Sequence, residues 1–119
     1  MMGDIRLKTV DYELGGRTYR LTCNMNVLAD VQEAYNGNLV QALNTSGGLK
    51  GTLEFLAAML TDAADTQGVK DADGCPLHFT AKELGRELTL RETMAAGEKI
   101  MPIIRAAVAA ETGEEKEKN

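Results

Sequence analysis

The stretch ELGGRTYRLTCNMNVLADVQEAYNG, residues 13–37, decides the fold because its hydrophobic period changes once. Up to about Cys23, apolar and polar residues alternate, which is typical of a strand with one buried face. From about Asn24, apolar residues recur at helical spacing. Gly15-Gly16 suits a two-residue primed turn, in which both residues take positive φ. The stretch therefore predicts a β-hairpin that passes directly into a helix.

The two-residue turn also predicts the register of the hairpin, which we expect over about residues 8–23. One face of the ribbon is apolar, and the other is polar with an opposite-charge pair. The expected cross-strand pairs are Leu14 with Arg17, Tyr12 with Tyr19, Val10 with Leu21, Asp11 with Arg20, and Glu13 with Thr18. Two strands alone are marginal in water, so the apolar face must pack on helices or on another copy of the chain.

The helices that follow are marked by caps and glycines. Asn24 or Asn26 caps the first helix, and Gly37 is its predicted C′ residue. A short helix over residues 39–43 ends in Ser46-Gly47-Gly48. Thr52 is the predicted cap of a longer helix that runs to about Asp65. That helix is apolar around most of its circumference, which predicts a central position in the domain or under a partner.

Residues 66–78 carry two Gly, one Pro and an Asp-Gly pair, which predict a loop. Thr80 and Glu83 then form a capping box, with a staple of Phe79 on Leu84. Thr89 and Glu92 form a second box, which begins the last helix. Pro102 lies inside that helix, where we expect a kink or a restart.

The predicted fold is α+β and mostly α: an N-terminal two-stranded β-hairpin followed by a bundle of about four to five helices. We expect one domain over residues 1–110, with helices over about 25–110. Residues 111–119, ETGEEKEKN, are charged and aperiodic, and we expect a disordered tail there.

Composition excludes several classes of protein. The chain has 119 residues, a net charge of −5 and a pI of about 4.9, which argues against nucleic-acid binding. No apolar run approaches the roughly 18 residues of a membrane span. Two cysteines far apart in sequence, Cys23 and Cys75, favour buried thiols over a disulfide or a zinc site.

No group of residues indicates catalysis. His78 is the only histidine, and its spacing from the Ser, Cys and Asp residues suggests no Ser-His-Asp or Cys-His pairing. We therefore expect it at the surface or next to a helix cap. The loop aspartates lack the order and the closing Glu of a calcium loop; they are Asp62, Asp65, Asp71 and Asp73. Gly47, Gly48 and Gly51 are not followed by the Lys-Ser or Lys-Thr pair of a phosphate loop, and no predicted strand precedes them, so they are interpreted as a linker. We expect a non-enzymatic protein with no catalytic, cofactor or metal site.

The order of segments resembles a known family. A ribbon ending in YELGGRTYRLT passes into NMNVLADVQEAYNG, and NLVQAL, TLEFLAAMLTDA and FTAKELGREL follow before a long last helix. Over about residues 8–110 this resembles the tail assembly chaperones of long-tailed bacteriophages, prophages and gene transfer agents.

The resemblance implies a function without cofactor or catalysis. Such chaperones bind the tape-measure protein, whose apolar helical segments would otherwise aggregate, and recruit tail-tube protein to it. They act in the cytoplasm of the bacterial host and are absent from the mature virion. Many also have a longer form, made by a −1 frameshift, and the final Glu117-Lys118-Asn119 permits a slippery A AAA AAC heptamer.

The family carries over no fixed binding residues, so candidates come from the apolar face of the helices. They are Met59, Met94, Met101, Ile104 and Val108, if part of that surface is uncovered; for each residue taken singly, core packing is the favoured interpretation. The free edges of the hairpin would also allow pairing between copies. The alternatives are a head–tail connector or minor tail protein, and a small metal-binding regulator that uses His78 and the Asp71/Asp73 loop.

Overall fold

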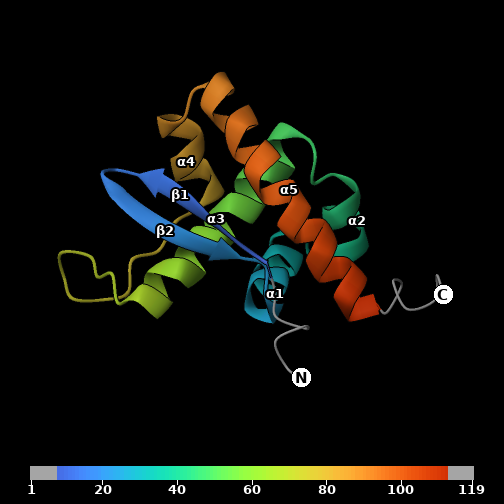
Figure 1. Cartoon of the computed structure of the whole chain (residues 1–119), viewed down its shortest axis with the longest axis horizontal. Coiled ribbons are helices and arrows are strands. Elements are labelled where there is room, and N and C mark those ends of the chain that lie inside the picture. Colours follow the sequence, from blue (N-terminus) through green and yellow to red (C-terminus); the bar gives the residue numbers. More distant parts are fainter. Residues whose placement is uncertain (1–7, 113–119) are drawn as a thin grey trace.

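A computed structural model describes residues 8–112 and has an antiparallel two-stranded hairpin followed by five helices in that range (Figure 1). This is the α+β, mostly helical class that the sequence predicts. The strands are β1 (Thr9–Leu14) and β2 (Arg17–Thr22). The helices are α1 (Met25–Ala34), α2 (Leu39–Asn44), α3 (Leu49–Gln67), α4 (Ala81–Glu87) and α5 (Leu90–Thr112).

The hairpin has the predicted register in every pair from Thr9–Thr22 to Leu14–Arg17. Gly15 and Gly16 take φ angles of 61° and 79°, as a primed turn requires. On the polar face, Arg20 Nε lies 3.5 Å from Asp11 Oδ1. On the other face Tyr19 and Leu21 of β2 are buried, because this strand packs on α3.

The passage from strand to helix follows the prediction, with Asn24 as the N-cap. Its Oδ1 accepts a hydrogen bond from the Val27 N–H at 3.0 Å. At the other end of α1, Asn36 takes the left-handed φ of 57° and is the C′ residue. The Gly37 N–H then reaches back to the Gln32 carbonyl at 2.8 Å. The assignment of C′ to Gly37 was wrong by one position, because asparagine also tolerates this conformation.

The start of α3 differs from the prediction. The helix begins at Leu49 after the N-cap Gly48, so Thr52 lies inside it and is not its cap. Thr52 is buried, and its hydroxyl donates to the Ser46 carbonyl at 3.3 Å. The reason is Gly51: without a side chain, the first turn of α3 packs directly on the chain at Thr45. A packing contact, not a local cap, therefore sets this boundary.

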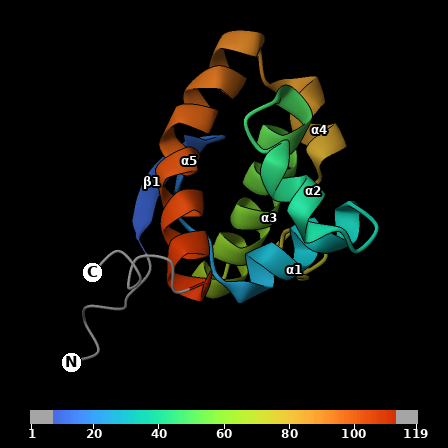
Figure 2. The ribbon, with the colours of Figure 1, turned by 90° about the vertical axis from the view of Figure 1, so that its right-hand side faces the viewer.

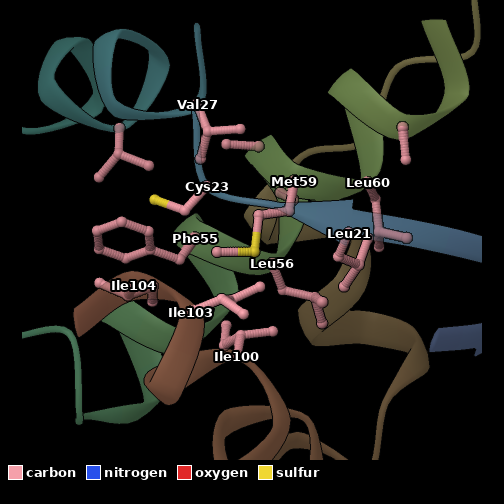
Figure 3. Packing of buried hydrophobic residues seen from close by; sticks show 14 of the residues in the cluster. Leu21, Cys23, Val27, Phe55, Leu56, Met59, Leu60, Ile100, Ile103 and Ile104 are labelled. Atoms are coloured by element: carbon pink, nitrogen blue, oxygen red, sulfur yellow. The ribbon is translucent and has the colours of Figure 1, made fainter. Parts of the chain in front are cut away.

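Helix α3 is the centre of the molecule and contacts β2, α1, α4 and α5 (Figures 1 and 2). This is the first of the two positions predicted for it. Ten of its residues are buried, including Phe55, Leu56 and Met59. Figure 3 shows them beside Leu21 of β2 and Ile100 of α5. The core is therefore mostly aliphatic, with Phe55 and Tyr19 as its buried aromatic residues, and is built around one helix.

Both predicted capping boxes form. The Glu83 N–H donates to Thr80 Oγ1 at 3.1 Å, and the Thr89 N–H donates to Glu92 Oε1 at 2.9 Å. A kink or a restart was predicted at Pro102; helix α5 continues through it to Thr112, so the helix does not restart there. Pro102 is on the exposed side of α5, where water can satisfy the carbonyl that loses its donor. The tail was predicted to begin at residue 111, but residues 111 and 112 still belong to α5, so that boundary was wrong by two residues. Residues 113–119 of the predicted tail lie outside the described part.

Candidate protein-binding groove

Among the described residues, five large apolar side chains are mostly exposed, and three of these lie around the first half of α5. Leu90 and Met94 belong to α5 itself and are 61% and 58% exposed. Leu49, the first residue of α3, is 53% exposed and lines a pocket with Met94. The other two are Met25 and Val40, on α1 and α2. Clustered apolar exposure of this kind is typical of interaction surfaces.

An open groove continues from this cluster along α5. It consists of two adjoining pockets of about 400 Å³ and 380 Å³, which share Met101 and Arg105. The segment from α2 to the start of α3 forms the opposite side (Figure 2). That side contributes Leu43, Ser46, Gly47, Leu49 and Thr52.

The structure brings four of the five predicted binding residues to this groove. Met94, Met101 and Val108 follow one another at seven-residue spacing, so they lie along one side of α5. Met94 is exposed, and Met101 and Val108 are half-buried. Ile104 also lines the groove but is only 2% exposed. It belongs mainly to the core (Figure 3).

Met59 lies elsewhere. It is fully buried in α3 and lines none of the groove pockets (Figure 3). In this conformation Met59 is a core residue and cannot contact a partner bound in the groove.

The groove is lined by apolar side chains together with the buried hydroxyl residues Ser46, Thr52 and Thr93, and it also has charged side chains. Glu98 and Arg105 line the pocket around Met101, and both are exposed. Arg91 lies beside Met94 on the outer face of α5. Such a site has thioether and aliphatic contacts for an apolar segment and alternating charges to fix its register.

His78 lies at a different place, in the loop before α4. It is exposed and next to the cap residues of α4, as predicted, and it borders pockets of about 450 Å³ and 340 Å³. Asp30, Glu33 and Glu54 line the larger pocket. Within residues 8–112, no three His, Cys, Asp or Glu side chains converge as a metal site would require.

Two of the loop aspartates have structural contacts. Asp62 accepts a hydrogen bond from Asn24 Nδ2 at 2.9 Å, which ties α3 to the cap of α1. Asp71 Oδ1 accepts from the backbone N–H groups of Asp73 and Cys75 at 2.9 and 3.0 Å, closing the loop on itself.

The two cysteines differ. Both are free; Cys23 is buried, whereas Cys75 is exposed in the 68–80 loop, so the prediction of two buried thiols was wrong for Cys75. Burial raises the pKa of Cys23 to about 11. Burial, and then the carboxylate of Glu92, also raises the pKa of Tyr12.

Sequence reasoning missed Leu49 and Leu90 as surface residues. Each is the first residue of its helix, at the end of the packed region, and its side chain is more than half exposed. Their position directly after Gly48 and after the Thr89 cap was the available signal. The fold and site define a mostly helical α+β protein with an open, partly apolar groove along its last helix.

The sequence matches no family model, no similar curated protein was found, and no solved structure matches the fold. Across residues 8–112, none of the helices has a stretch long and apolar enough to span a membrane.

Proposed function

We propose that this protein is a tail assembly chaperone of a long-tailed bacteriophage or related element. In this role it binds the tape-measure protein and helps to recruit tail-tube subunits, without catalysis or a cofactor. It acts in the host cytoplasm and leaves before the virion is complete. The observation that carries the proposal is the groove along α5, with Met94 and Met101 at its opening and centre.

The groove suits a helical client for two reasons. Its apolar residues on α5 recur every seven positions, which matches the spacing of an apolar seam on a facing helix. Methionine side chains adapt to different apolar partners, which a chaperone of a long and varied helical protein needs. The resemblance in segment order supports the same function.

The test is co-expression with the tape-measure gene that neighbours the native gene. We expect the chain to keep the tape-measure protein in the soluble fraction and to co-purify with it. Met94→Lys should abolish both effects, because it places a charge at the opening of the groove. Met25→Lys is the matched control: Met25 is 59% exposed against 58% for Met94, and it lines no groove pocket. The proposed surface would be contradicted if both variants lost tape-measure binding equally, or if neither variant lost it.

A second test uses the native gene with its downstream DNA and an N-terminal tag. A minor longer product that continues in the −1 frame after about Lys118 would support the chaperone role. Mass spectrometry of purified particles then separates the alternatives, since a connector or minor tail protein stays in the particle. Recovery of this chain from mature virions would refute the chaperone proposal.

A further inference from the structure

The outer face of α5 carries two unpaired, opposite charges on either side of an exposed apolar spot. Arg91 and Glu98 are seven residues apart, so they lie at nearly the same angle around the helix. Met94 and Ala95 lie between them along the axis, and Leu90 adjoins them. Within the described chain, neither the Arg91 nor the Glu98 side chain has a hydrogen-bond or ion-pair partner, although α5 has other polar contacts.

This arrangement is complementary to itself. When two copies of α5 pack antiparallel across a two-fold axis near Met94 and Ala95, residue numbers on facing positions sum to about 189. Arg91 of each copy then faces Glu98 of the other copy. A two-fold interface must match a surface with itself, and an opposite-charge pair placed symmetrically about an apolar centre meets that condition.

From this geometry we infer that the first half of α5 binds a second copy of this chain, as an antiparallel two-fold dimer with reciprocal Arg91–Glu98 ion pairs. Met94 of both copies fills the centre of the interface. Ala95 allows the helix axes to approach to about the 8 Å end of the usual range. The dimer covers Leu90 and Met94, which account for two of the exposed apolar side chains.

The hairpin is a poorer place for a second copy than its free edges suggest. On the outer edge of β2, the Gln67 carboxamide accepts from the Arg20 N–H at 2.8 Å and donates to the Thr18 carbonyl at 3.3 Å. On the edge of β1, Lys99 Nζ lies 3.5 Å from the Asp11 carbonyl. Side chains therefore occupy backbone groups that an added strand would need.

This inference does not rest on the proposed function, although the two surfaces adjoin at Met94. Glu98 also lines the groove, so a charge reversal can affect client binding as well as the dimer. The assays separate the two results: sedimentation of the chain alone, with no client present, measures only the dimer, and co-expression with the client measures only client binding.

The experiment is sedimentation equilibrium of the full chain and three variants: Arg91→Glu, Glu98→Arg, and the double variant. By symmetry, each single reversal turns two attractive contacts into two repulsive ones, so we expect a rise of about tenfold or more in the dimer dissociation constant. The double variant exchanges the two charges and should restore the wild-type constant. Both substituted side chains are exposed, so we expect every variant to fold as the wild type does. Far-UV circular dichroism of each variant is the control for folding.

Two results would overturn the inference. One is a wild type that sediments as a monomer up to about 1 mM, since no specific interface is then present. The other is a dimer whose dissociation constant is unchanged by the single reversals, since it then uses another surface.

Cross-linking tests the position of the axis directly. Ala95→Cys in a Cys75→Ser background should give a covalent dimer with a short bis-maleimide, because the two introduced thiols face each other. Lys82→Cys, at an exposed position of α4, is the control and should remain monomeric on a denaturing gel. Equal cross-linking of both variants would refute the proposed axis.

Discussion

Gly51 provides the sharpest test of how the chain is packed. It is the third residue of α3, and Ala in its place would put a Cβ atom against the Thr45 carbonyl and only 2.7 Å from Ser46 Cα. Both contacts are to backbone, which cannot move aside as a side-chain end can. Gly51→Ala must therefore push the start of α3 away from the α2–α3 turn.

Two effects of Gly51→Ala oppose each other. Replacing Gly by Ala within a helix ordinarily stabilises by about 0.5–1 kcal/mol. Overpacking in a rigid, buried site costs about 1–3 kcal/mol. Because the clash here is with backbone, we expect the second effect to dominate and the free energy of unfolding to fall by about 1–2 kcal/mol net.

Gly85→Ala in α4 is the matched control. The nearest atom to its added Cβ is Leu53 Cδ1 at 3.5 Å, an ordinary van der Waals contact with a movable group. Only the helix effect remains, so Gly85→Ala should stabilise by about 0.5–1 kcal/mol. The two substitutions are chemically identical, and the structure predicts opposite signs for them.

The assay is urea unfolding followed by circular dichroism at 222 nm, with midpoint and slope compared among the three proteins. With a slope of about 1–2 kcal/mol/M, Gly51→Ala should lower the midpoint by about 1 M. If Gly51→Ala stabilises as much as Gly85→Ala does, the close packing of α3 on the turn is refuted.

Three further predictions concern single contacts. Thr80→Ala removes the cap of α4 and should cost about 1 kcal/mol in urea unfolding; no change would contradict the capping box. Gln67→Ala removes the acceptor of the Arg20 N–H, so that amide should exchange faster with deuterium than in the wild type, while unchanged exchange would mean that the β2 edge is not covered. At pH 8 a thiol reagent should modify Cys75 at once and Cys23 only on unfolding. Because folding raises the pKa of Cys23 to about 11, from about 8.5 unfolded, the unfolded state binds fewer protons between these values. The contribution of Cys23 to stability is therefore full below about pH 8.5 and is lost as the pH rises to about 11, and Cys23→Ala should remove that part of the pH dependence.

The order of elements could be predicted from the sequence because each depends on nearby residues. The Gly15-Gly16 turn predicts the register of the hairpin: the five pairs named from the sequence all form, and Thr9–Thr22 follows the same register. The boxes begun by Thr80 and Thr89 fix two helix starts in the same way. In each case the groups that bond are within a few residues of one another along the chain.

The candidate site was predictable only in part. Helical periodicity placed Met94, Met101, Ile104 and Val108 on the apolar side of α5. It did not separate Ile104, which is buried, from Met94, which is exposed. That difference depends on where the α2–α3 turn ends against α5, and no local pattern carries this information.

The sequence by itself determined the hairpin, its register, the capped helices and the fold class, since these follow from backbone conformation and short-range hydrogen bonds. Only the tertiary structure decided that α3 begins at Leu49, that Cys75 is exposed, and that a groove remains along α5. Those features depend on which surfaces meet across long separations in the chain. Burial of Thr52 against Ser46 shows the reason: a residue suited to a local cap was used instead to join a helix to the turn before it.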